Sequence, residues 1–214
     1  MCSCFRSFLA SVMATSLDDL RSLLFWRAVL AEFLGTLLLV FVGCGSCIGW
    51  EDDYAPSVTQ IALCFGLIVA TVVWAIGHVS GGHVNPAVTM AMLVTRNVSL
   101  ARALFFILAQ CAGACVGALI LKGVTPNQFE GTLGQTNLGS DVTPGQGFGV
   151  EFVVTFVLVF TVFSSVDGKR TDLNGSTPLT IGLSVAVCHL AAVSHSFSIS
   201  SQLYTVFCLK TSSI

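Results

Sequence analysis

One short run of the sequence combines residues that can build a hydrogen-bonding site inside an apolar layer. Residues 80–89 read SGGHVNPAVT and contain the triplet Asn85-Pro86-Ala87, which occurs once in the chain. Asn favours helix starts, Pro fits the first helical turn because no N–H is needed there, and Ala suits close packing. We therefore expect a helix to begin at this triplet, with unpaired N–H groups and a positive partial charge at its N-terminus.

The expected helix is too short to cross a membrane. Residues 86–95 form about 15 Å of helix, which is about half the thickness of the hydrocarbon core of a bilayer. They end a run of 42 residues, 54–95, that contains no Asp, Glu, Lys or Arg. A half-helix at membrane depth is tolerated only where protein or a watery cavity satisfies its end. The triplet therefore predicts a pore or a binding site.

The composition is that of a membrane protein. Hydrophobic residues make up 54% and charged residues 9% of the 214 residues, and the mean hydropathy is +0.87, whereas soluble domains average about 25% charged residues. The net charge is −2 and no basic run is present, so we expect no nucleic-acid partner. The expected spanning helices cover residues 26–49, 57–79, 103–121, 148–166 and 177–193.

The charges between these spans orient the chain. Lys and Arg precede the first span and follow the half-helix and the fourth span, whereas the loops 50–56 and 123–147 contain neither. By the positive-inside rule the N-terminus, residues 1–25, is expected to be cytoplasmic. Within the third span, Gly113 and Gly117 form a GxxxG pattern, which indicates either a specific close contact or generic small-residue packing.

The sequence also repeats itself. Residues 31–41, AEFLGTLLLVF, align with residues 150–160, VEFVVTFVLVF, and this alignment pairs Glu32 with Glu151. Residues 65–67 align with residues 181–183 at nearly the same offset. With three spans in the first half, the second half must run inverted, an arrangement that places a site at the midplane between the repeats. We assign residues 26–122 to the first repeat and residues 148–193 to an incomplete second repeat.

Glu32 and Glu151 are carboxylates inside apolar spans. Such groups are rare and face a bundle interior or a cavity. We expect both to accept hydrogen bonds from re-entrant backbone N–H groups. The alternative is that both lie at the membrane boundary, beside Arg27 or the outer loop.

Several segments together resemble the aquaporin family, and specifically its water-selective members. They are AEFLGT, SGGHVNPAVT, ALFFILAQCAGA, GQGFGVEF and GLSVAVCHLAA, and the resemblance covers about residues 25–193. It implies an all-α transmembrane fold with an inverted repeat, six spanning helices and two half-helices that meet at two Asn-Pro-Ala motifs. It also implies a homo-oligomer, usually a tetramer, with a pore in each subunit.

The resemblance assigns roles to the residues of the triplet and of the loop before it. Asn85 would donate its amide to water at the pore midpoint, and Pro86 and Ala87 would start the half-helix whose dipole opposes cations. Water would move in single file along the backbone carbonyls of Gly81, Gly82, His83 and Val84. Glycine allows the unusual dihedral angles that this use of the backbone needs.

Two further residues resemble the constriction filter of water-selective members. They are Phe65 and His189, and the resemblance implies Trp and Gly at these two positions in glycerol-conducting relatives. Phe with His would leave room for water but little room for a polyol. The imidazole would offer the passing water a hydrogen bond. The alternatives are an ordinary apolar helix residue for Phe65 and a satisfied core histidine for His189.

His78 and His83 suggest a metal pair, but no third ligand is near, and we expect no metal or cofactor.

The resemblance ends before the C-terminal tail. The repeat predicts a second triplet at residue 201, but residues 201–204 read Ser-Gln-Leu-Tyr and the filter Arg is absent as well. The longest apolar stretch of the Ser-rich tail, residues 194–214, has seven residues, far short of the ~20 that a span needs. We expect five spanning helices and one re-entrant half-helix, with the sixth helix and the second half-helix missing.

Three functional hypotheses follow. The first is a membrane water channel of the aquaporin family, in the plasma membrane by resemblance or retained in the endoplasmic reticulum, with conduction impaired by the missing half. The second is a non-conducting truncated subunit that associates with full-length paralogous channels. The third, a membrane enzyme, is disfavoured because no nucleophile, metal set or phosphate loop accompanies the buried carboxylates.

Overall fold

The computed structural model describes residues 19–51, 54–131, 133–134, 142–171 and 175–193, and every structural statement below refers to these residues. They form helices and no strand, which confirms the all-α prediction. The elements are α2 (Leu23–Gly45), α3 (Val58–Ser80), α4 (Pro86–Val94), α5 (Leu100–Val124), the 3-10 turn η1 (Asn127–Phe129), α6 (Pro144–Val166) and α7 (Thr177–Val193). The Ser-rich tail of the sequence analysis lies outside the described residues.

Four helices are long and apolar enough to cross a membrane. They are α2, α3, α5 and α6, with 23 to 25 residues each. The fifth expected span is α7, an apolar helix of 17 residues, which corresponds to about 25 Å. The half-helix α4 has 9 residues and begins at Pro86, as the triplet predicted.

Local sequence signals explain where the helices start and stop. Ser57 caps α3 by accepting a hydrogen bond from the Gln60 N–H, and Gly81 ends this helix in the left-handed conformation, at φ +94°. Thr143 and Gln146 form a capping box around Pro144 at the start of α6. These boundaries lie one to four residues from the expected ones because an apolar run alone does not mark a cap.

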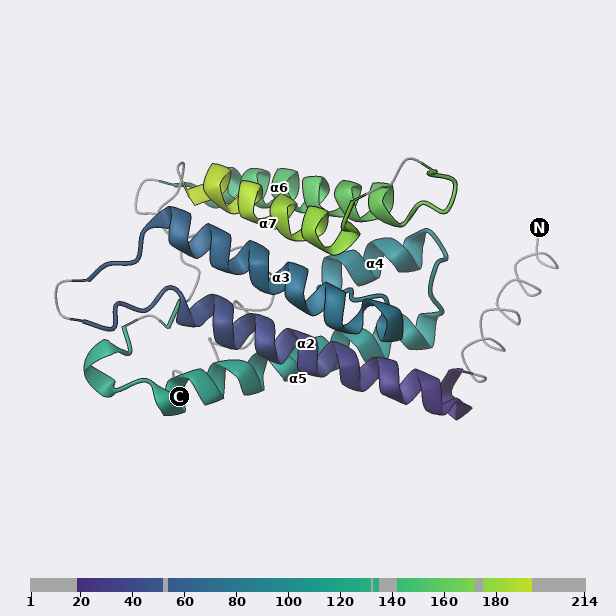
Figure 1. The fold of residues 1–214 in the computed structure, drawn as a ribbon, viewed down its shortest axis with the longest axis horizontal. Helices are drawn as coiled ribbons and strands as arrows, with labels where there is room; N and C mark the ends of the chain where they lie inside the picture. Colours follow the sequence, from purple (N-terminus) through teal and green to yellow (C-terminus); the bar gives the residue numbers. More distant parts are fainter. Residues whose placement is uncertain (1–18, 52–53, 132, 135–141, 172–174, 194–214) are drawn as a thin grey trace.

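The spanning helices pack side by side in an order that differs from the chain order. Figure 1 shows α7 between α6 and α3, and α2 between α3 and α5. At the α2–α5 contact a Cβ built on Gly113 would lie 2.2 Å from the carbonyl oxygen of Phe33, and one on Gly117 would lie 2.5 Å from that of Leu37. The GxxxG pattern therefore serves a specific close contact, in which the missing side chains let two backbones approach.

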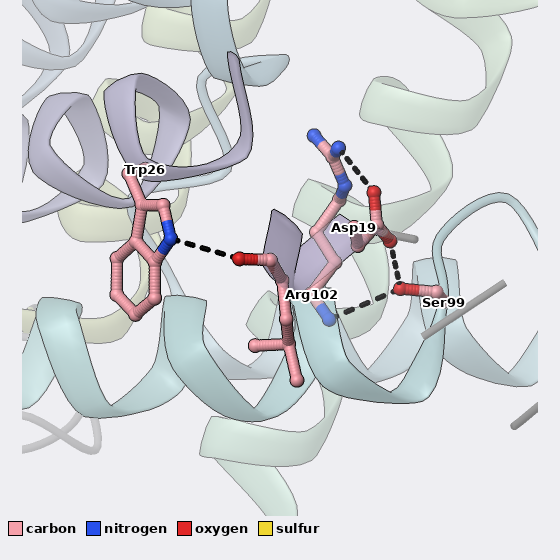
Figure 2. A network of polar contacts seen from close by, with 5 residues as sticks. Asp19, Trp26, Ser99 and Arg102 are labelled. Atoms are coloured by element: carbon pink, nitrogen blue, oxygen red, sulfur yellow. Dashed lines mark hydrogen bonds and ion pairs between the residues drawn. The ribbon is translucent and has the colours of Figure 1, made fainter. Parts of the chain in front are cut away.

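A polar cluster ties the segment before α2 to the start of α5. Arg102 Nη2 lies 2.9 Å from Asp19 Oδ1, and the Ser99 hydroxyl donates to the second oxygen of the same carboxylate (Figure 2). The indole N–H of Trp26 donates to the carbonyl of Leu20 at 3.1 Å. The contacts hold residues 19 and 20 against the end of the bundle where α5 begins.

Candidate functional site

The segment between α3 and α4 has an unusual backbone. Gly81, Gly82 and Val84 have positive φ values of 94°, 63° and 38°. Glycine adopts this region freely, whereas a β-branched residue such as Val is strained there. Strain of this kind persists only where the surrounding structure holds the residue in place.

Glu32 of α2 is the group that holds the segment. Its side chain is fully buried, and its carboxylate accepts hydrogen bonds from the backbone N–H groups of His83 and Val84 at 3.0 and 2.7 Å. The Ser80 hydroxyl and the Gln110 amide donate to the same carboxylate at 2.6 and 2.7 Å. Four donors therefore satisfy one buried carboxylate, as a charge at membrane depth requires.

Asn85 caps the half-helix. Its side-chain oxygen accepts a hydrogen bond from the Ala87 N–H at 2.7 Å, while Pro86 occupies the first helical turn. The Nδ2 group has no hydrogen-bond partner among the described residues, so two amide donors remain available at the helix N-terminus. The side chain is 9% exposed, which places these donors inside the protein.

Phe65 and His189 lie against each other. Their rings stack with centroids 4.7 Å apart and an interplanar angle of 19°, and both side chains are buried. His189 Nδ1 lies 3.0 Å from the carbonyl of Val185, one turn earlier in α7. Gly43 of α2 makes room for this pair, since a Cβ built there would lie 2.5 Å from the Phe65 ring.

Glu151 occupies a different environment from Glu32. It is half-buried on α6, and no described residue forms a hydrogen bond with its carboxylate. Of these two carboxylates, only that of Glu32 accepts hydrogen bonds from the re-entrant segment 81–85 within the described part of the chain. Residue 201, where the repeat predicts the second triplet, lies outside the described residues.

A cavity of about 750 Å³ opens beside the re-entrant segment. Its lining includes Gly81 and His83 of that segment, Arg102 of α5 and Asp167 after α6. His83 packs the edge of its ring against Phe106. No group of three or more His, Cys, Asp or Glu side chains is placed for a metal ion within the described part of the chain.

Three further residues belong to the site and were not predicted from the sequence. Gln110 and Thr89 are fully buried and join Glu32 in one hydrogen-bond network, and Arg102 lines the cavity. A signal for Gln110 was present, because a lone amide inside an apolar span needs a buried partner. Thr89 gave no such signal, since a helical Thr can bond to its own backbone.

The chain is similar to known membrane channels in sequence and in fold. The family model described as "Major intrinsic protein" matches residues 19–199. Aquaporin-4 of Mus musculus is 52% identical over 174 residues, which is 80% of this chain and 54% of the relative. Aquaporin-1 of Homo sapiens is 44% identical over 184 residues, covering 83% of this chain and 68% of the relative. The chain thus spans about half the length of its aquaporin-4 relatives.

A solved structure shares the fold. The X-ray structure of the aquaglyceroporin from Plasmodium falciparum superimposes with a TM-score of 0.74 at 20% identity, over 87% of this chain and 81% of that one. At that identity the likeness concerns the arrangement of helices alone. The extent of the family match and the identity to both aquaporins establish that this chain belongs to the major intrinsic protein family of membrane channels, which are not enzymes.

Proposed function

We propose that the chain is a passive water channel. The observation that carries the proposal is Asn85, whose free amide donors stand at the N-terminus of a half-helix inside an apolar bundle. A donor in that position binds the oxygen of a passing water molecule, and the positive end of α4 disfavours cations and protons. The relatives named aquaporin-4 and aquaporin-1 support this assignment.

The backbone of residues 81–84 supplies the acceptors in this proposal. Water moves past the carbonyls of Gly81, Gly82, His83 and Val84, whose positions are fixed by the hydrogen bonds from His83 and Val84 to Glu32. A rigid series of acceptors replaces the hydrogen bonds that water leaves behind in bulk solvent. The left-handed φ values of Gly81 and Gly82 support this use of the backbone.

Phe65 and His189 form the constriction in this proposal. Two stacked rings bring the walls together and exclude larger solutes such as polyols. Because the rings touch, water passes beside the pair and not between them.

The N-terminus is cytoplasmic, the membrane is the plasma membrane, and the channel assembles as a homo-tetramer in this proposal.

Conduction is expected to be lower than in relatives with two Asn-Pro-Ala triplets. Ser201 occupies the register position of the second Asn, and the half-buried Glu151 lacks a hydrogen-bond partner among the described residues. A pore with one triplet has fewer fixed donors at its midpoint, so water enters with a larger loss of hydrogen bonding.

A second candidate function is association with full-length paralogous subunits. The observation in its favour is a row of phenylalanines on the outer face of α6, each 60 to 73% exposed: Phe148, Phe152, Phe156 and Phe160. Residues at four-residue spacing form a ridge that is inclined to the helix axis and can pack into a groove of a second helix. In this role the chain would occupy a subunit position without conducting.

Osmotic shrinkage of proteoliposomes tests the main proposal. Vesicles with the purified chain should shrink faster than empty vesicles and more slowly than vesicles with equal amounts of a full-length family member. Shrinkage equal to that of empty vesicles would refute water conduction, and a rate equal to the full-length member would refute the reduction. Co-expression tests the second candidate, which requires that the activity of a full-length channel falls when this chain is added.

A further inference from the structure

A buried polar cluster lies behind the re-entrant segment. Gln110 of α5 donates from Nε2 to Glu32 at 2.7 Å and to the Thr89 hydroxyl at 3.0 Å. Thr89 of α4 in turn lies 3.1 Å from His83 Nδ1 and 3.0 Å from the carbonyl of Asn85. The cluster therefore connects a charged group on α2 to the imidazole of the re-entrant segment.

Glu32 determines which way the Gln110 amide points. Reversing the amide would place its oxygen 2.7 Å from the Glu32 carboxylate, where two acceptors repel each other. In the observed orientation the Gln110 Oε1 atom is buried and has no donor among the described residues. An unpaired neutral oxygen costs less than an acceptor facing a buried charge, so Nε2 is fixed as the donor to Thr89.

The hydrogen bonds of the Thr89 hydroxyl then determine which ring nitrogen of His83 carries the proton. A hydroxyl has one proton and two acceptor positions. The hydroxyl donates to the second lone pair of the Asn85 carbonyl, whose first lone pair accepts the Thr89 N–H, and one acceptor position of the hydroxyl takes the Gln110 N–H. The remaining acceptor position faces His83 Nδ1, and this contact is a hydrogen bond only if Nδ1 carries the proton.

The opposite edge of the imidazole lies against Gly81, and both residues line the cavity. A Cβ built on Gly81 would lie 3.4 Å from His83 Nε2 and Cδ2. No described residue forms a hydrogen bond with Nε2. Arg102 lines the same cavity, but its Nη2 is bound to Asp19.

We infer that Gln110 and Thr89 are positioning residues that hold neutral His83 in the Nδ1–H tautomer, so that Nε2 presents a hydrogen-bond acceptor to the cavity. The ligand class is a small molecule with an O–H donor. Its meaning for transport rests on the proposed water channel, because water can donate to His83 and then accept from Asn85 Nδ2. The tautomer itself does not depend on conduction.

Nitrogen NMR of the histidine-labelled chain in lipid bilayers tests the inference directly. The His83 signals are identified by their loss in His83→Gln, and the measurement is made at a pH where the ring is neutral. We expect a protonated Nδ1 and an unprotonated Nε2 in the unsubstituted chain. A protonated Nε2 there would overturn the inference without any variant having to fold.

Two substitutions separate positioning from a merely structural role. Thr89→Val has nearly the same shape but no hydroxyl, and it should move His83 toward the Nε2–H tautomer. Thr89→Ser keeps the hydroxyl and should preserve the Nδ1–H signals. Unchanged tautomers in Thr89→Val would count against the role of Thr89. Vesicle shrinkage is recorded in parallel, so a chain with the expected tautomer and no water conduction refutes the proposed function alone.

Discussion

Gly66 of α3 and Gly182 of α7 face each other where the two helices cross. A Cβ built on Gly66 would lie 2.7 Å from the Gly182 carbonyl oxygen, and one built on Gly182 would lie 2.3 Å from the Gly66 carbonyl oxygen. The two glycines are equivalent in the internal sequence repeat, and their contact is reciprocal, as expected where a pseudo-twofold axis relates the halves. No other residue type allows these backbones to come so close.

Replacing Gly182 with Ala should therefore destabilise the chain. The added methyl group meets backbone on α3, which cannot move aside as a side chain would, and overpacking of this kind costs about 1–3 kcal/mol. The measurement is the thermal unfolding midpoint in detergent. Gly149→Ala on α6 is the control, because a Cβ there meets nothing within 4 Å. Equal midpoints for the two variants would contradict the close crossing.

Glu32→Gln should destabilise the re-entrant segment. The substitution replaces one carboxylate oxygen with an NH₂ group that faces donors, and each lost hydrogen bond to a charged acceptor costs about 1.5–3 kcal/mol. Thermal unfolding reports the loss, and protease sensitivity between α3 and α4 reports the local loosening. Glu51→Gln makes the same chemical change at an exposed site and should be neutral. The account fails if Glu32→Gln is as stable as this control.

Gly43→Ala should displace the Phe65 ring from His189. A Cβ at residue 43 would lie 2.5 Å from the ring, whereas one at Gly45 would meet Leu121 at 3.5 Å, an ordinary contact. Unfolding midpoints should fall for Gly43→Ala and stay unchanged for Gly45→Ala. In a double-mutant cycle, Phe65→Ala should remove most of the cost of Gly43→Ala. Additive effects would show that the methyl group does not act through the ring.

Asn85→Asp should change permeation with little effect on the helix start. The carboxylate can still accept from the Ala87 N–H, but it loses both amide donors and adds a negative charge. We expect slower water flux and a new cation leak in vesicles, measured by light scattering and by an ion-sensitive dye. Asn127→Asp, in the exposed turn η1, is the matched control. Unaltered flux and leak would argue against a place for Asn85 in the pore.

Asp19→Asn should weaken the cluster of Figure 2 by a small, salt-dependent amount. The Arg102 and Asp19 side chains are 27% and 20% exposed, so solvent screens their attraction. Ion pairs of this kind contribute about 0–1 kcal/mol, and less at high ionic strength. The difference in unfolding midpoint from the unsubstituted chain should shrink as salt is added. A large loss that salt does not change would indicate a structural role beyond the ion pair.

Much of the site follows from short-range patterns in the sequence. The triplet predicted a helix start at Pro86, and the structure begins α4 there. The position of Glu32 in an apolar run predicted that backbone N–H groups donate to its carboxylate. In the structure the N–H groups of His83 and Val84 do so. The paired residues of the repeat pointed to an inverted arrangement, and the repeat-equivalent glycines meet at the crossing of α3 and α7.

The sequence by itself determined the helices, the half-helix and the family, because caps, apolar runs and motifs act over a few neighbouring residues. Only the tertiary structure decided that Gln110 reaches both Glu32 and Thr89, that His83 lies against Thr89, and that Phe65 stacks on His189. The two stacked rings are far apart in the chain, and their contact depends on how closely α3 and α7 approach. That approach is set by the fit of whole helix surfaces, which no local pattern encodes.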